Sequence, residues 1–155
     1  GSEIMTVKEM WDKYISISGK SINTPYESWH FCNNEADANE LAKLTLLGIK
    51  RATASLYKSF EAENEPIPKI GDLIVITNWD SEAVCIIEVK KVEILPFKDI
   101  TKEHAQIEGE GDKSLEYWRR GHINFFTEET KELGIEFNEE LEVIFETFQV
   151  VYPVD

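Results

Sequence analysis

Two residues of this sequence, Lys50 and Thr53, have side chains that could act as a base and a nucleophile, and a third, Glu108, could act as a general acid or base. Lys50 and Thr53 lie in one short stretch, Gly48 to Thr53, which follows a run of periodic apolar residues. A hydroxyl is a weak nucleophile until a neighbouring base takes its proton. Lysine can be that base only if burial or nearby charge lowers its pKa. The stretch therefore offers a nucleophile and a base, provided that the chain turns between them.

The same stretch also has a purely structural explanation. Gly48 stands where a helix C-cap glycine is expected, because glycine takes a left-handed φ without a Cβ penalty. Lys50 would then interact with helix carbonyls, and Thr53 would be an ordinary β-branched strand residue. In a flat strand, residues three apart point to opposite faces, so the two side chains converge only if Lys50 still belongs to the turn. On local pattern alone, the structural explanation is favoured.

Glu108 opens a loop with three carboxylates and two glycines, Glu108 to Asp112. A carboxylate on a glycine-flanked loop can act as a general acid or base, because the backbone can fold closely over a substrate. A solvated acidic turn is the commoner alternative in a chain this rich in Asp and Glu. His104, four residues earlier, is either a proton shuttle or a hydrogen-bonded structural histidine.

The remaining candidates are aromatic or basic. Trp29, Phe31 and Trp118 could stack on a nucleobase, although core packing explains each of them as well. Several cationic side chains could together bind a phosphate group, or could form surface salt bridges with the many carboxylates. These cations are Lys50, Arg51, Arg119, Arg120 and His122.

The sequence predicts neither a metal nor a cofactor. His30, His104 and His122 lie far apart and lack the short ligand spacings of a structural zinc site. Cys85 lies in an apolar strand, so a reduced, buried thiol is expected, and with it a cytoplasmic location. The apolar runs are shorter than the roughly 18 to 20 residues that a membrane helix needs, so we expect no membrane association.

The formal net charge of −14 disfavours some classes of binding partner, long polyanions above all. Non-specific binding to nucleic acid depends on Lys and Arg that neutralise phosphates and release counterions. A chain this acidic repels a long polyanion away from local basic patches, so we expect no DNA duplex as a partner. Its length of 155 residues predicts a single domain, which we place at residues 3–155, with Gly1-Ser2 as an expression scar.

The pattern of apolar residues and caps predicts a mixed set of elements. Helices are expected at about 6–18, 35–47, 99–106 and 114–132, and strands at about 52–56, 73–77, 83–95 and 141–152. Residues 21–33 are predicted to be an ordered loop, and 57–70 an acidic connection. Residues 73–95 are expected to form a hairpin. This order contains no repeating βαβ unit, which favours an α+β fold on an antiparallel, barrel-like sheet.

Several stretches, taken in order along the chain, resemble the ASCH domain family. They are Trp29–Phe31, Ala36–Ala42, Gly48–Thr53, Pro68–Asp72, and Glu108–Asp112 followed by Trp118–His122. The resemblance covers about Val7 to Tyr152. It implies a PUA-like fold, an α+β structure with a mixed or antiparallel β-barrel of about five to six strands and flanking helices. It also implies an RNA-linked role.

A shorter branch of the same fold comprises amidohydrolases that remove the acetyl group from N4-acetylcytidine. Their catalytic lysine and threonine in G-x-K-x-x-T, and their glutamate in T-x-x-H-A-x-x-E, fall here on Lys50, Thr53 and Glu108. This chain departs from that branch by an added N-terminal helix and an insertion at 109–126. Because both can reshape the pocket, the substrate is not carried over.

The resemblance thus predicts an amide hydrolase that acts on a small acylated nucleoside resembling an N4-acylcytidine. Its catalytic residues would be Lys50, Thr53 and Glu108. The alternative is an RNA-binding module, or a ribonuclease, that holds short single-stranded RNA in the same cleft. In either case the expected substrate-binding residues are Trp29, Phe31, Arg51, Trp118 and Arg119.

Overall fold

The computed structural model of this chain describes residues 4–154. The chain divides into two units by its internal contacts. The first contains the chain up to Lys50, Gly71–Val89 and the chain from Phe148 onward, and the second contains Arg51–Ile70 and Lys90–Thr147. The single domain at residues 3–155 stays a prediction, and the expression scar at Gly1-Ser2 lies outside the described residues.

Helix α1 (Val7–Ser18) of the first unit begins and ends as its sequence predicts. The Thr6 hydroxyl accepts a hydrogen bond from the backbone N–H of Glu9, and the Glu9 carboxylate accepts one from that of Thr6. Gly19 ends the helix with a φ of 76°. The apolar side of α1 packs against the sheet in a cluster formed by Met10, Trp11, Tyr14, Ile15, Leu73, Val75 and Ile86.

Strands β3 (Leu73–Thr77) and β4 (Ala83–Pro96) form the predicted antiparallel hairpin. The prediction of a loop at 21–33 is wrong in part, because β1 (Glu27–Trp29) lies within it and pairs with β3 in parallel. A strand of three residues is too short to show the alternation of apolar and polar residues by which a strand is recognised in a sequence. Its partner is also distant in sequence, since Ser28 pairs with Val75.

Helix α2 (Glu35–Leu46) positions Lys50. The Asn34 side chain caps its start, and Gly48 follows its end with a φ of 77°. The backbone N–H groups of Ile49 and Lys50 both donate to the carbonyl of Leu44, at 2.9 and 3.0 Å. Lys50 is therefore held in the turn that closes the helix, before the next strand begins.

In the second unit, β2 (Ala52–Leu56) pairs in antiparallel fashion with β5 (Glu142–Tyr152). Helix α3 (Tyr57–Glu63) follows β2 directly, so the acidic connection predicted over 57–70 contains a helix that the sequence pattern did not predict. This helix has no side-chain hydrogen bond at its N-cap and no buried residue. The signals that reveal a helix in a sequence, a capping residue and an apolar stripe, are thus both missing.

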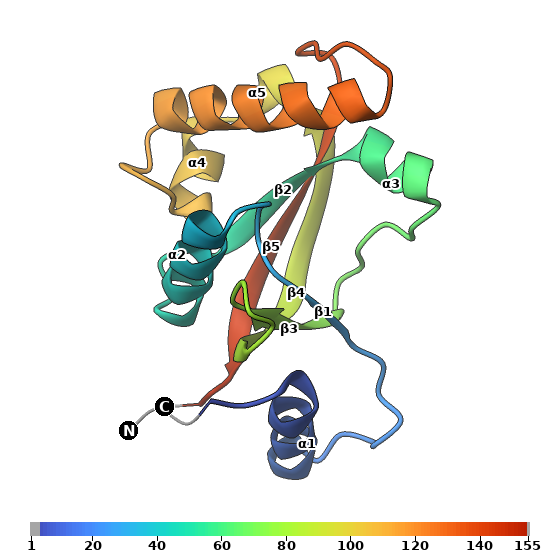
Figure 1. The fold of residues 1–155 in the computed structure, drawn as a ribbon, viewed down its shortest axis with the longest axis vertical. Coiled ribbons are helices and arrows are strands. Elements are labelled where there is room, and N and C mark those ends of the chain that lie inside the picture. The colour runs from blue at the N-terminus through green and yellow to red at the C-terminus, as the bar shows by residue number, and fades with distance from the viewer. Residues whose placement is uncertain (1–3, 155) are drawn as a thin grey trace. The chain divides into compact units, whose positions relative to one another are not determined.

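A 3₁₀ turn, η1 (Phe97–Asp99), leads from β4 towards α4 (Lys102–Glu108) and α5 (Leu115–Glu132), which lie next to each other (Figure 1). The hydroxyls of Thr101 and Ser114 cap the starts of α4 and α5. These helices cover one face of the strands in a cluster of buried side chains. Its members are Ala52, Leu56, Phe97, Ile100, Ala105, Trp118, Phe126, Val143 and Phe145.

The five strands follow the order β1-β3-β4-β5-β2, and the pairing is mixed because β1 is parallel to β3. The α+β class is therefore confirmed. Among the described residues, Cys32 and Cys85 are not joined in a disulfide, and burial raises the pKa of Cys85 to about 12. Within residues 4–154, no helix combines the length and apolar character that crossing a bilayer requires.

Candidate functional site

Glu108 is a buried carboxylate. It is the last residue of α4, ahead of Gly109 with a φ of 70°, and only 1% of its surface is exposed. The alternative of a solvated acidic turn is therefore wrong at this position. A carboxylate loses most of its hydration when it is buried, so it persists only with strong compensating hydrogen bonds or charges.

Two side chains of α5 supply that compensation. The indole N–H of Trp118 donates to Oε1 of Glu108 at 2.7 Å, a short distance for an N–H···O bond. The Nε2 atom of His122 lies 3.3 Å from the same oxygen. Trp118 and His122 are one helical turn apart, which places both on the same face of α5. The helix therefore presents two nitrogen groups to one carboxylate oxygen.

The His122 ring is held by one polar contact and two aromatic contacts. Its Nδ1 lies 2.8 Å from the carbonyl oxygen of Trp118, and its plane stacks on the indole at a centroid distance of 4.0 Å. Phe126 makes a T-shaped contact with the same ring at a centroid distance of 5.5 Å. Burial alone would lower the pKa of His122. The charge and hydrogen bond of Glu108, the charge of Glu110 and the Trp118 carbonyl outweigh it and hold that pKa above 6.5.

Glu108, Glu110 and His122 also form a set that could hold a metal ion, because one ligand atom from each lies within 4.8 Å of the others. A histidine whose Nδ1–H donates to a backbone carbonyl is a common arrangement around metals. However, the Glu108 oxygen that faces His122 already accepts the Trp118 indole proton. The hydrogen bonds account for the cluster as it stands, and we do not assign these residues as metal ligands.

His104 forms a second histidine–glutamate pair in the same unit. Its Nε2 lies 3.3 Å from Oε2 of Glu93, which is 32% exposed. Its Nδ1 accepts a hydrogen bond from the backbone N–H of Thr101 at 3.0 Å and thereby completes the capping box of α4. His104 is thus part of the helix start, which is the structural role that the sequence left open.

Thr53 and a buried glutamate share one face of the strand pair β2–β5. Ala52, Ala54 and Leu56 pack into the core cluster of the second unit, so Thr53 points to the opposite face. Its cross-strand partner is Glu146, which is 5% exposed. Sequence reasoning missed Glu146. The signal was a carboxylate directly after three apolar residues, Val143 to Phe145, of a predicted strand.

Lys50 belongs to the first unit, whereas Thr53 and Glu108 belong to the second. It is 1% exposed, and its Nζ atom lies 4.9 Å from the centre of the Phe31 ring. Trp29 packs edge-on against Phe31 at 5.1 Å. The first unit therefore gathers three predicted site residues, with Phe31 against the buried lysine and Trp29 against Phe31. That Lys50, Thr53 and Glu108 act in one site remains a prediction.

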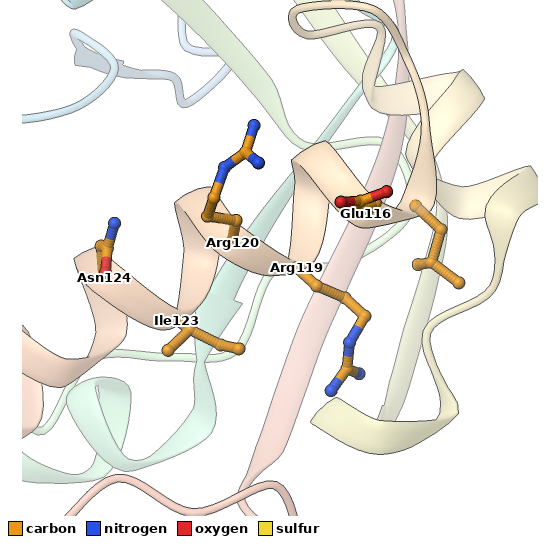
Figure 2. Close-up of a pocket in the computed structure, with 6 residues that line it drawn as sticks. Glu116, Arg119, Arg120, Ile123 and Asn124 are labelled. Atoms are coloured by element: carbon orange, nitrogen blue, oxygen red, sulfur yellow. The ribbon is translucent and has the colours of Figure 1, made fainter.

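The predicted cations of the second unit are more accessible. Arg51 and Arg120 are exposed, and Arg119 pairs with Glu139 at 2.5 Å. Figure 2 shows Arg119 and Arg120 projecting from α5 beside a pocket of about 570 Å³. The residues that line this pocket are Leu115, Glu116, Arg119, Arg120, Ile123 and Asn124. Trp118, by contrast, is 3% exposed and its indole N–H is engaged by Glu108.

Comparison with known proteins places the chain among ASCH domains. The family model for the ASCH domain matches residues 27–152. The crystal structure of an ASCH domain from Lactobacillus crispatus JV V101 shares 39% identity and a TM-score of 0.87, over 94% of this chain and 93% of that one. Protein EF3133 from Enterococcus faecalis V583 shares 29% identity and a TM-score of 0.85, over 94% and 87%.

A hypothetical protein, PH0355, shares 19% identity and a TM-score of 0.53 over 81% of this chain and 97% of that one, which supports the fold alone. No curated protein matches this sequence. The similar structures confirm the α+β fold of the PUA-like type that the sequence predicted.

Proposed function

This chain belongs to the ASCH domain family, and we propose that it is an amide hydrolase acting on a small acylated nucleoside such as an N4-acylcytidine. One observation carries the proposal. Glu108 is 1% exposed, yet the indole N–H of Trp118 bonds its Oε1 at 2.7 Å and His122 Nε2 lies 3.3 Å from that oxygen. A carboxylate fixed in this way is suited to moving a proton.

Burial of ionisable side chains favours an enzyme over a binding module. Burying a charged group costs free energy, and such costs are concentrated at sites that need a shifted acid or base. Lys50, also 1% exposed, is a second example. A lysine that served to neutralise the phosphates of a polynucleotide would instead need to reach the surface. The net charge of −14 likewise favours a small substrate over a long polyanion.

The proposed reaction has two steps. In the first, the Thr53 hydroxyl attacks the acyl carbonyl and passes its proton to the neutral amine of Lys50. The C–N bond then breaks as Glu108 delivers a proton to the leaving nitrogen. In the second, water attacks the acyl-threonine and gives one proton back to Glu108. Lys50 returns its proton to Thr53, so the enzyme is regenerated and needs no metal or redox cofactor in this scheme.

The other predicted residues have supporting parts in the proposal. Phe31 packs against Nζ of Lys50 and Trp29 packs against Phe31, so both would shape the surroundings of the amine. Arg51 and Arg119 would contact the nucleoside. Trp118 would act on Glu108 through its hydrogen bond and would not stack on a base. A cytoplasmic location, where free nucleosides occur, is part of the proposal.

The direct test is to incubate the full chain with N4-acetylcytidine and to follow the release of cytidine by chromatography. We expect turnover by the wild type, and loss of at least about 100-fold in Lys50→Ala and in Thr53→Val. Lys43→Ala, which removes an exposed lysine from α2, is the matched control and should retain full activity. Full activity in Lys50→Ala would remove the basis for the assignment.

The second candidate is a module that binds, or cleaves, short single-stranded RNA. The observation that favours it is the pocket of about 570 Å³ that Arg119 and Arg120 of α5 help to line (Figure 2). It predicts binding to labelled RNA oligonucleotides that weakens steeply as salt is raised, and further weakening in Arg120→Ala. Product analysis on the same RNA separates cleavage from binding. Absence of binding at low salt would reject this candidate.

A further inference from the structure

The contacts of His122 dictate where its protons lie. Nδ1 is 2.8 Å from the carbonyl oxygen of Trp118. A carbonyl oxygen only accepts hydrogen bonds, so Nδ1 must carry a hydrogen and donate it. In a neutral imidazole the other nitrogen then has no hydrogen. The Nε2 atom of a neutral His122 would therefore present a lone pair.

That lone pair would face an acceptor. Nε2 lies 3.3 Å from Oε1 of Glu108, and an ionised carboxylate oxygen is also an acceptor only. Two opposed lone pairs in a buried site repel each other, with little water to screen them. A proton on Nε2 removes the conflict and turns the contact into a charge-assisted hydrogen bond.

We propose that His122 carries a proton on both ring nitrogens and stores the proton that Glu108 delivers during catalysis. The storage part rests on the proposed function, whereas the charge state of the pair does not. Glu108 is then the ionised member of an imidazolium–carboxylate pair. His122 is a positioning residue, because it acts on the substrate through Glu108.

The surroundings of the ring support a cation. The charged groups that face it are Glu108, at the end of α4, and Glu110, in the following loop, and both are acidic. The indole of Trp118 stacks on the imidazole at 4.0 Å with an interplanar angle of 14°, a geometry in which an aromatic face attracts a positive ring. The indole N–H also donates to Glu108, so it stabilises the negative partner of the same pair.

The proposal completes the proton balance of the reaction. In the first step a proton moves from Nε2 of His122 to Glu108 as Glu108 protonates the leaving nitrogen. In the second step the proton taken from water returns through Glu108 to Nε2. His122 is neutral between the two steps and is protonated again at the end of each catalytic cycle.

The test uses ring ¹⁵N chemical shifts of the full, ¹⁵N-labelled chain without substrate, so that failure of the proposed hydrolysis cannot affect it. The measurement is made at about pH 7.5, where an ordinary histidine is largely neutral. We expect both nitrogens of His122 to show shifts of protonated nitrogens. His104, whose Nδ1 accepts from the Thr101 N–H, is the internal reference and should show one unprotonated nitrogen. His122→Asn and His104→Asn assign the signals.

Two variants make the result specific. Glu108→Gln should leave His122 with one unprotonated nitrogen at the same pH, whereas Glu93→Gln should leave its signals unchanged. An unprotonated Nε2 in the wild type would overturn the proposal. A second result would also overturn it. If the ring ¹⁵N shifts of His122 in chelator-treated protein reach or leave the protonated range only after Zn²⁺ or Mn²⁺ is added, the cation between His122 and Glu108 is a metal ion.

Discussion

The second unit contains two histidine–glutamate pairs with the same separation and opposite chemistry. In both, Nε2 lies 3.3 Å from a carboxylate oxygen, and the histidine side chains are almost equally accessible at 14% for His122 and 13% for His104. The difference lies at the other nitrogen. Nδ1 of His104 faces a backbone N–H, whereas Nδ1 of His122 faces a backbone carbonyl.

This difference decides what each pair can do. His104 satisfies both contacts as a neutral ring, accepting at Nδ1 and donating from Nε2 to Glu93. His122, facing an ionised Glu108, satisfies both as a cation. The two carboxylates differ as well, since Glu93 is 32% exposed and Glu108 1%. A histidine near a glutamate is thus informative only when the partner of its second nitrogen is known.

Replacing each glutamate of the two pairs by glutamine should give the largest difference in kcat/KM. Glu108→Gln should lower kcat/KM for N4-acetylcytidine by at least about 100-fold, because a general acid–base group contributes about 10²- to 10⁴-fold. Glu93→Gln should change it by less than about threefold, since its histidine supports a helix start. Equal losses in the two variants would end the distinction between the pairs.

Trp118→Phe should separate the hydrogen bond from the packing. The phenyl ring keeps an aromatic face near His122 and Phe97, but the donor to Glu108 is lost. A hydrogen bond to a charged group contributes about 1.5–3 kcal/mol, and we expect a loss of that order in the free energy of unfolding by urea. Trp79→Phe, at a residue 38% exposed, is the control and should change stability by less than about 0.5 kcal/mol.

Gly111→Ala tests whether the loop between Glu108 and Trp118 must keep its shape. Gly111 has a φ of 55°, and an added Cβ would lie 2.4 Å from the Tyr117 ring. We expect a cost of about 1–3 kcal/mol in stability, measured in the same urea series. Gly121→Ala, inside α5 with open space around it, should instead stabilise the protein by about 0.5–1 kcal/mol. A neutral Gly111→Ala would show that this loop adapts freely.

The positive charge of His122 should make the free energy of unfolding depend on pH. Its pKa is raised in the folded chain above 6.5, so the imidazolium stabilises the fold fully below pH 6.5. This contribution is lost as pH rises through the folded pKa. The difference in unfolding free energy between wild type and His122→Asn should therefore shrink in that window. In a Glu108→Gln background the same comparison should lose this pH dependence.

The sequence was sufficient for elements with a cap and an apolar stripe. Helices α1, α2 and α5 have both, and the capping residues Thr6, Asn34 and Ser114 act as their positions predict. Helix α3 and strand β1 lack these signals and were missed. Their formation depends on contacts with distant parts of the chain, as in the pairing of Ser28 with Val75.

The candidate site was predictable in its residue types more than in its geometry. The family resemblance selected Glu108, but the acidic composition around it predicted a solvated turn. Burial of Glu108 depends on α5 crossing close to the end of α4. The local sequence pattern around Glu108 does not indicate such a contact between helices. Trp118 was predicted as a stacking surface and His122 as a surface cation. The i, i+4 spacing of these two residues on one helix was the signal that they could share a partner.

The central claim is that Glu108 is an ionised carboxylate although it is buried. Its side-chain carboxyl ¹³C shift in the full chain at about pH 7.5, assigned by loss of the signal in Glu108→Gln, tests this directly. We predict a shift in the range of ionised glutamates, matching that of Glu93 in the same spectrum. A shift in the range of a protonated carboxyl group would contradict the imidazolium–carboxylate pair and the proton transfer built on it.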